Sequence, residues 1–110
     1  MILAEWSCEL PERLLDDFFQ FAEQKLKPFY ESYGCKRYAL FIPVEKRYFA
    51  YQIEAKKTKY TEQILFSTIE DFERFLERVR RDPHAKEMTD SYRKKFRVKS
   101  VSFKILTQKV

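Results

Sequence analysis

Residues 61–88 constrain the fold most, because they read as a strand followed directly by a helix that stops at a proline. The apolar run Ile64-Leu65-Phe66 has the length of a strand. Beyond it, apolar side chains recur at spacings of three and four and mark one helical face, at Ile69, Phe72, Phe75, Leu76 and Val79. This region therefore predicts a helix that lies back on a sheet.

Side chains that satisfy free backbone groups mark both ends of this helix. The spacing of a capping box occurs in two overlapping pairs, Ser67 with Glu70 and Thr68 with Asp71. Pro83 cannot continue the helical hydrogen-bond ladder and biases Asp82 away from helical geometry. Asp82 is then placed to cap a second, short helix whose first residue is Pro83. We expect a helix that is broken at residues 82–83.

The rest of the chain alternates between strand patterns and a helix pattern. The side-chain alternation of a strand covers four segments, 2–8, 36–43, 47–55 and 98–107. A long helix is predicted from Pro11 to Tyr33, with a kink or restart at Pro28. Gly34 is the single glycine of the chain, and it falls where a left-handed C-cap is favoured. Residues 43–46 are short enough to join the second and third strands as a hairpin.

The predicted fold class is α+β. The order of elements gives a ferredoxin-like βαββαβ antiparallel sheet with its helices on one face, and the segment 47–55 would be an extra hairpin strand. The length of 110 residues suits one domain, residues 1–110.

Several strands carry large apolar side chains on both faces, as at Leu40-Phe41 and Leu65-Phe66. A sheet that is apolar on both faces is normally covered on both, and the chain has no further long helix to do so. We therefore expect a homodimer through the sheet face, in which two sheets meet and bury Trp6, Tyr38, Tyr51 or their neighbours.

Composition narrows the cellular setting. No apolar run approaches the roughly 20 residues of a membrane helix, and the first residues lack the basic and apolar regions of a signal peptide. The two cysteines are far apart in sequence and predict reduced, buried thiols in a cytoplasmic protein. One glycine, no asparagine and 35% charged residues match the bias of heat-adapted proteins.

Two segments make the layout resemble the dimeric α+β barrel superfamily, which includes antibiotic-biosynthesis-type monooxygenases, haem-degrading relatives and NIPSNAP-like proteins. They are KPFYESYGCKRYALF at 27–41 and ILFSTIEDFERFLERVRRDPHAKEM at 64–88, with its Ser/Thr cap, its Phe-x-x-Phe helix and its Pro-His break. The resemblance implies a barrel built by two protomers, with a pocket between each sheet and its helices. It implies no single activity, because these folds serve oxygenases, isomerases, decarboxylases and sensor domains.

The sequence departs from the haem-degrading relatives, which use an asparagine in the first strand together with a tryptophan and a helical histidine. This chain has no asparagine; Trp6 lies in the first strand, and His84 is the single histidine. A glycine-rich phosphate loop, GxSxG and HExxH are absent, so no cofactor is expected. One histidine without neighbouring ligands also predicts no metal site.

If the chain binds a small molecule, the candidate pocket residues are aromatic side chains and the single histidine, namely Trp6, Tyr38, Tyr51 and His84. Histidine is the natural acid or base near neutrality, and tyrosines can orient a polar ligand. Each has a plainer structural explanation. Trp6 and the tyrosines suit a core or a dimer interface, and His84 suits the surface at a helix start.

The positive charge of the chain is uneven. No acidic residue follows Asp90, and the formal net charge is +5. A polyanion-binding face would use two basic clusters, Lys56, Lys57 and Lys59 with Arg93, Lys94, Lys95, Arg97 and Lys99. The segment 47–51, RYFAY, partly matches the aromatic RNA-binding strand of RRM domains, although its glycine is replaced.

Three interpretations of function stay open, and they do not agree on whether the chain is an enzyme. The first is a cytoplasmic homodimeric α+β barrel that binds a small apolar or aromatic ligand, with cofactor-independent oxygenase-like or isomerase-like chemistry. The second is a module that binds nucleic acid or another polyanion through its basic C-terminal region. The third is a structural or interaction protein without chemistry.

Overall fold

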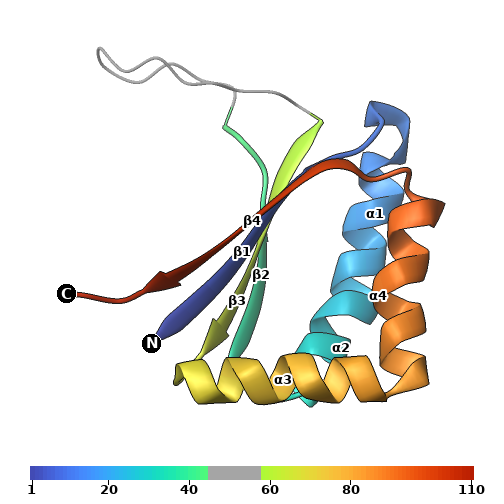
Figure 1. Cartoon of the computed structure of the whole chain (residues 1–110). Coiled ribbons are helices and arrows are strands. Elements are labelled where there is room, and N and C mark those ends of the chain that lie inside the picture. The colour runs from blue at the N-terminus through green and yellow to red at the C-terminus, as the bar shows by residue number, and fades with distance from the viewer. Residues whose placement is uncertain (45–57) are drawn as a thin grey trace, which may run out of the picture.

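The computed structural model describes residues 1–44 and 58–110, in which a twisted antiparallel sheet carries helices on one face (Figure 1). The elements in chain order are β1 (Ile2–Glu9), a 3-10 turn η1 (Glu12–Leu14), α1 (Leu15–Phe21), a π-helical segment η2 (Ala22–Leu26), α2 (Lys27–Ser32), β2 (Arg37–Phe41), β3 (Lys59–Phe66), α3 (Ile69–Arg81), α4 (Pro83–Lys95) and β4 (Lys99–Thr107). The predicted strand 47–55, which includes Tyr51, lies outside the described residues.

The four described strands are ordered β2-β3-β1-β4, and every neighbouring pair is antiparallel. β1 is central, so that Trp6 lies opposite Glu62 of β3 on one side and Phe103 of β4 on the other. Each helical connection crosses over one intervening strand. Because such crossovers are right-handed, both connections reach the same face of the sheet. The predicted ferredoxin-like α+β fold is confirmed.

The core lies between the sheet and its helices. α1, α2 and α4 stand against the sheet, and α3 passes across their lower ends (Figure 1). The fully buried side chains come from both layers and are mostly aromatic or aliphatic, among them Phe18, Leu26, Tyr60, Ile64 and Phe66. Aromatic rings link the layers directly. Phe18 of α1 lies 4.5 Å from Tyr60 of β3, between ring centroids.

A π-helical segment, η2, explains how the first helix keeps one face buried. Phe18, Ala22, Leu26 and Tyr30 are all buried, and they recur at a spacing of four residues. In a regular α-helix, three such steps would rotate the stripe by about 120°, because each residue turns the helix by about 100°. The π-helical turn in η2, in which the Lys27 N–H donates to the Ala22 carbonyl, holds one residue more than an α-helical turn. This extra residue offsets about 100° of the rotation of the buried stripe.

The same segment accommodates Pro28, which has no N–H to donate. Pro28 lies in the first turn of α2, directly after η2. The predicted restart at this proline is therefore confirmed, and the helical segment continues to Ser32. Gly34 follows with φ +101°, the left-handed geometry that its position after the helix predicted.

The predicted caps on the second half of the chain are also present. Of the two capping-box pairs, the structure uses Thr68 with Asp71, and the Thr68 hydroxyl accepts from the Asp71 N–H at 3.1 Å. Asp82 ends α3 and caps α4. Its Oδ1 accepts from the backbone N–H of His84 at 3.0 Å and of Ala85 at 3.5 Å. The predicted break at residues 82–83 thus separates two helices.

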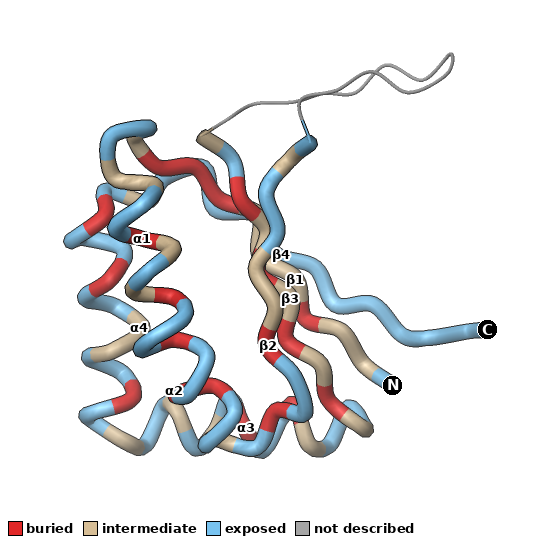
Figure 2. The backbone as a smooth tube through the Cα atoms, turned by 180° about the vertical axis from the view of Figure 1, so that it is seen from behind, coloured by how far each residue is buried: buried red, intermediate tan, exposed pale blue. Residues whose placement is uncertain are grey.

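The opposite face of the sheet, called the open face below, carries no helix from residues 1–44 and 58–110. Its middle is polar, where Glu5 accepts from the Gln63 amide at 2.9 Å and lies 3.3 Å from Lys104 Nζ. One end is apolar and holds a shallow cavity of about 240 Å³, lined by Met1, Leu3, Leu65, Leu106, Thr107 and Gln108. β4 is exposed along its whole length (Figure 2).

Trp6 and Tyr38 do not lie on the open face, which differs from the expectation that they meet a second copy there. Even-numbered residues of β1 and β2 point toward the helices, and Tyr38 is buried among them. Trp6 packs against the core and lies 4.5 Å from the Phe103 ring. Side chains alternate between the two faces of a strand, so Trp6 shares the face of Ala4 and Cys8, which are buried in the core.

None of the helices in the described part of the chain combines the length and the apolar character needed to cross a membrane.

We predict that Gly34→Ala lowers the free energy of unfolding by about 1–2 kcal/mol, because a Cβ disfavours the left-handed backbone. The space around Gly34 is open, so a steric clash with neighbours does not contribute. Urea denaturation followed by circular dichroism measures the change. Gly34→Asn, which tolerates this geometry better, should lose less. Equal stability of the alanine variant and the wild type would contradict the prediction.

Candidate functional site

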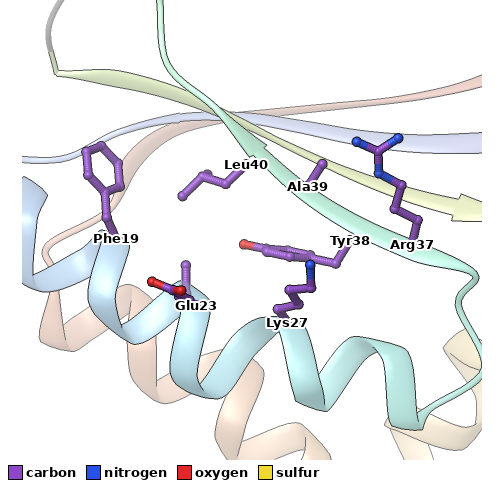
Figure 3. A pocket seen from close by; sticks show the side chains of 8 residues that line it. Phe19, Glu23, Lys27, Arg37, Tyr38, Ala39 and Leu40 are labelled. Atoms are coloured by element: carbon purple, nitrogen blue, oxygen red, sulfur yellow. The ribbon is translucent and has the colours of Figure 1, made fainter.

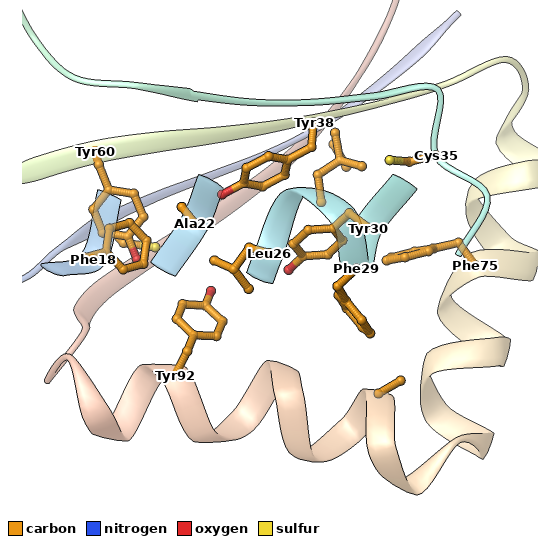
Figure 4. Packing of buried hydrophobic residues seen from close by; sticks show 14 of the residues in the cluster. Phe18, Ala22, Leu26, Phe29, Tyr30, Cys35, Tyr38, Tyr60, Phe75 and Tyr92 are labelled. Carbon is orange, nitrogen blue, oxygen red and sulfur yellow. The ribbon is translucent and has the colours of Figure 1, made fainter. Parts of the chain in front are cut away.

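A buried acidic side chain, Glu62, lies in the middle of β3 and is held by tyrosines. Glu62 is 1% exposed. The Tyr38 hydroxyl from β2 donates to Glu62 Oε2 at 2.6 Å, and the Tyr92 hydroxyl from α4 donates to Oε1 at 3.2 Å. Figure 4 shows Tyr38 entering the core from the sheet and Tyr92 from the opposite helix. Both carboxyl oxygens therefore have a partner, one from each layer of the fold.

Strand alternation places the carboxyl group there. Tyr60, Glu62, Ile64 and Phe66 share the inner face of β3. Burial raises the pKa of Glu62, although the hydrogen bonds from Tyr38 and Tyr92 oppose the shift by stabilising the carboxylate. Burial, and then the nearby charge of Glu62, raise the pKa of the Tyr38 phenol far above its ordinary value. The group can thus hold protons that a surface carboxyl would release.

Neighbouring aromatic rings fix the position of Tyr38. The Tyr30 ring of α2 stacks on it with centroids 5.2 Å apart and planes 9° apart. Tyr30 is itself buried. Tyr60, two residues before Glu62, has a buried hydroxyl that makes no hydrogen bond within the described residues. Stacking leaves Tyr38 little freedom, so its hydroxyl is held on Glu62.

Tyr38 also forms part of the wall of a cavity of about 270 Å³. This cavity lies between β2 and the helical segments α1, η2 and α2, and it is lined by Phe19, Ala22, Glu23, Lys27, Arg37, Tyr38, Ala39 and Leu40. Figure 3 shows Tyr38 projecting toward the helix that carries Glu23 and Lys27, whereas Arg37 points away. Tyr38 therefore touches both the cavity and the buried Glu62, and it is the link between them.

Of the three predicted pocket residues that the structure describes, one lines this cavity. Tyr38 lines it, while Trp6 lies on β1 against Phe103. His84 is exposed at the start of α4, where its N–H donates to the Asp82 cap. The fourth, Tyr51, lies outside the described residues. The arrangement matches the plainer explanations of Trp6 and His84, namely core packing and a helix start.

Lys59 of the first predicted basic cluster lies at the same end of the sheet as the second cluster. Lys59 of β3 and Lys99 of β4 both pair in register with Glu9 of β1, from opposite sides. Four further cations are exposed between the last turn of α4 and β4, namely Arg93, Lys94, Lys95 and Arg97. Lys56 and Lys57 lie outside the described residues. The fold therefore gathers cations that the sequence separates by some 40 positions.

Sequence reasoning missed Glu62, although a signal was present. Glu62 occupies an inward position of a strand, between Tyr60 and Ile64, where an apolar residue is normal. A charged residue at such a position needs a buried partner. The partners, Tyr38 and Tyr92, come from other elements, so only the folded chain reveals them.

The cysteines do not form a nucleophilic site. Cys8 and Cys35 are free and buried, as predicted. Burial raises the pKa of the Cys35 thiol to about 11, and it raises that of Cys8 as well. Thiolates, the reactive form, are therefore disfavoured. Within residues 1–44 and 58–110, no three histidine, cysteine or acidic side chains are grouped to hold a metal ion.

We predict that Glu62→Gln changes the pH dependence of stability. A carboxyl whose pKa is raised in the folded state binds its proton more tightly there than in the unfolded chain. Its ionisation therefore removes stability as pH rises from the unfolded pKa toward the folded pKa. Unfolding midpoints between pH 4.5 and 8, to be measured with both proteins, should fall more for the wild type than for the variant.

Glu73→Gln on the exposed face of α3 is the control, because it removes the same charge at the surface. Parallel pH profiles of the wild type and Glu62→Gln would contradict a raised Glu62 pKa.

Comparisons with known proteins bear on the fold. No family model and no curated protein matches the sequence. A solved protein from Agrobacterium tumefaciens, known by a locus name, superposes with a TM-score of 0.66 at 15% identity, over 99% of this chain and 94% of its own. A structure from Deinococcus radiodurans, provisionally named an antibiotic biosynthesis monooxygenase, superposes with a TM-score of 0.55 at 11% identity, over 100% of this chain and 94% of its own.

A dimeric ferredoxin-like protein from an uncultured marine organism gives a TM-score of 0.54 at 14% identity, over 98% of this chain and 91% of its own. At these identities the likeness concerns the fold alone. It extends over nearly the whole chain in each case, and two of the three neighbours carry names from the group that the sequence resembles. The chain has a ferredoxin-like α+β fold, as its sequence predicted.

Proposed function

We propose that the chain binds a small, largely apolar molecule in the cavity beside β2, and that Tyr38 and Glu62 transfer a proton to or from it. One observation carries the proposal. Tyr38 lines a cavity of about 270 Å³ and donates its hydroxyl proton at 2.6 Å to a carboxyl group that is otherwise sealed in the core. Groups with perturbed pKa values beside a cavity are frequent in active sites.

The cavity suits a ligand with an apolar body and one polar group. Phe19, Ala22 and Leu40 offer apolar contacts, and the volume lies near the lower end of small-molecule sites, which begin at about 300 Å³. Glu23 and Lys27 stand on the helix that forms one wall. A carbonyl or hydroxyl group of the ligand would meet the Tyr38 oxygen.

The chemistry that fits best is a proton shift without a cofactor, as in an isomerase. A proton leaves the ligand carbon next to a carbonyl and passes to the Tyr38 oxygen, while the Tyr38 proton passes to ionised Glu62. The proton returns to a different ligand atom by the reverse path. A general base works best when its pKa lies near the working pH, and burial moves Glu62 in that direction.

An oxygenase-like reaction would begin with the same proton removal. The Deinococcus radiodurans neighbour is provisionally named a monooxygenase, which makes this the second candidate. The ligand carbanion would then react with O₂. Consumption of O₂ during turnover separates the two candidates.

We further propose a homodimer in which the open faces of two copies meet. Leu3, Leu65 and Leu106 give this face an apolar end with a cavity of about 240 Å³, which a second copy could fill. Leu106 is 43% exposed on β4, an edge strand that nothing else in the described residues covers. One of the structural neighbours carries the name of a dimeric ferredoxin-like protein.

We predict that Tyr38→Phe greatly slows proton transfer but retains binding, because the ring stays in the cavity wall while the hydroxyl is lost. Native mass spectrometry of the purified protein comes first, to identify a retained small molecule. Exchange of its acidic hydrogen in D₂O, followed by NMR, then measures proton transfer. A fall of about 10²-fold or more is expected, the range of general acid–base contributions.

The matched control is Tyr92→Phe, which removes the other hydroxyl from Glu62 without touching the cavity. It should retain more exchange activity than Tyr38→Phe. Equal exchange rates in the wild type and Tyr38→Phe would refute the proposed role of Tyr38.

We predict that Leu106→Glu shifts the protein toward monomer, because the carboxylate would be buried at the interface. Light scattering coupled to size exclusion measures the mass. Ile105→Glu is a matched control, since Ile105 is 42% exposed on the same strand but lies opposite Ala4, on the helix side. A monomeric wild type, or monomers from the Ile105 variant alone, would contradict the open-face dimer.

A further inference from the structure

A third cavity lies on the other side of the first helix, away from Tyr38. It has a volume of about 350 Å³ and separates α1 and η2 from the end of α4. Its lining combines aromatic, amide and charged side chains, namely Leu14, Asp17, Gln20, Phe21, Gln24, Lys25, Lys95 and Phe96. No part of the proposed proton-transfer site uses these residues.

The aromatic part of this cavity is accessible from outside. Phe21 is only partly buried, and its ring centroid lies 5.3 Å from that of Phe96. The Lys95 ammonium lies 5.5 Å from the Phe21 ring and 5.3 Å from the Phe96 ring. A flat heteroaromatic group could stack on Phe21, where the neighbouring cation adds a favourable interaction.

Polar groups stand at hydrogen-bonding positions along the same wall. Asp17, Gln20 and Gln24 are exposed at spacings of three and four residues on the first helix. A carboxylate accepts hydrogen bonds, and an amide both donates and accepts them. Base edges present both kinds of group. The cavity thus offers stacking and edge contacts to one base.

A run of cations leads away from the cavity, from Lys95 to Arg97 and Lys99. The ion pairs among the described residues do not include these three side chains. Three of the four exposed arginines of α3 differ, because Arg74 pairs with Asp71, and Arg80 and Arg81 pair with Glu77. The cations beside the cavity are therefore available to an external anion.

The backbone at Arg97 has left-handed geometry. α4 ends in a Schellman motif, in which the Val98 N–H bonds the Arg93 carbonyl at 2.9 Å and the Arg97 N–H bonds the Lys94 carbonyl at 3.2 Å. The left-handed residue of this motif is usually glycine, but here it is Arg97 with φ 52°. A non-glycine residue at such a position costs stability.

We propose that this cavity and the cations Lys95, Arg97 and Lys99 form a binding site for single-stranded nucleic acid. One base stacks on Phe21 and meets Gln20 and Gln24, while the following phosphates lie along the cations. A single strand fits better than a duplex, because a base must leave its stack to enter the cavity. The site is separate from Tyr38 and Glu62, so the two proposals stand or fall independently.

Fluorescence anisotropy with a fluorescein-labelled 12-nucleotide oligothymidylate tests the proposal. The triple variant Lys95→Gln, Arg97→Gly, Lys99→Gln should weaken binding at least about tenfold at 0.1 M salt and reduce the salt slope by about 2, since each phosphate contact contributes about 0.7 for single strands. The control triple variant Arg74→Gln, Arg80→Gln, Arg81→Gln removes the same net charge from α3. It should bind almost as the wild type does.

Two single variants separate binding from folding. Arg97→Gly should raise the unfolding midpoint, because glycine suits the left-handed position, and yet weaken binding by severalfold. Phe21→Leu keeps an apolar side chain but removes the stacking surface, so binding should fall about fivefold or more. Thermal unfolding of each variant confirms that it is folded.

The result expected is tighter binding of the single strand than of a matched duplex, with losses in both the cation triple variant and Phe21→Leu. The proposal is overturned by an absence of binding at 50 mM salt, by equal losses in the two triple variants, or by binding of the duplex or of anionic phosphatidylserine vesicles in preference to the single strand.

Discussion

The pairing of β1 with both β3 and β4 is the constraint on which the rest of the structure depends. Because β1 occupies a central position, each helical connection has to cross a strand to return to the sheet. Right-handed crossovers then bring all the helices to one face. The core, the Glu62 group and the cavity beside Tyr38 lie on that side, while none of the described helices covers the apolar end of the open face.

Glu62 is a costly residue at its position. Core carboxyl groups rarely add stability, and an apolar replacement of similar size is often neutral or stabilising. Glu62 is nevertheless buried at the centre of the sheet with a partner on each oxygen. Its two partners come from β2 and α4, so the group joins elements that are far apart in sequence. Such an arrangement is easier to explain by chemistry than by packing.

Local patterns were sufficient for most of the fold. The Thr68 cap, the Asp82 break and Gly34 were predictable because each depends on neighbours within a few residues. The candidate site was not. Tyr38 was selected for its residue type, but its significance comes from Glu62, which lies 24 positions away. Trp6 and His84 were attractive as residue types, and the fold places them in packing and at a helix start.

The π-helical segment has a consequence for how this chain can tolerate insertions and deletions. Removing one residue from Ala22–Leu26 would restore regular α-helical hydrogen bonding, which is locally favourable. The lost residue and the lost bulge change the rotation by about 100° each, in opposite senses, so the residues that follow would keep their orientation. Tyr30 would stay on the face that stacks on Tyr38. Related sequences aligned across this helix should therefore accept a one-residue gap within this segment.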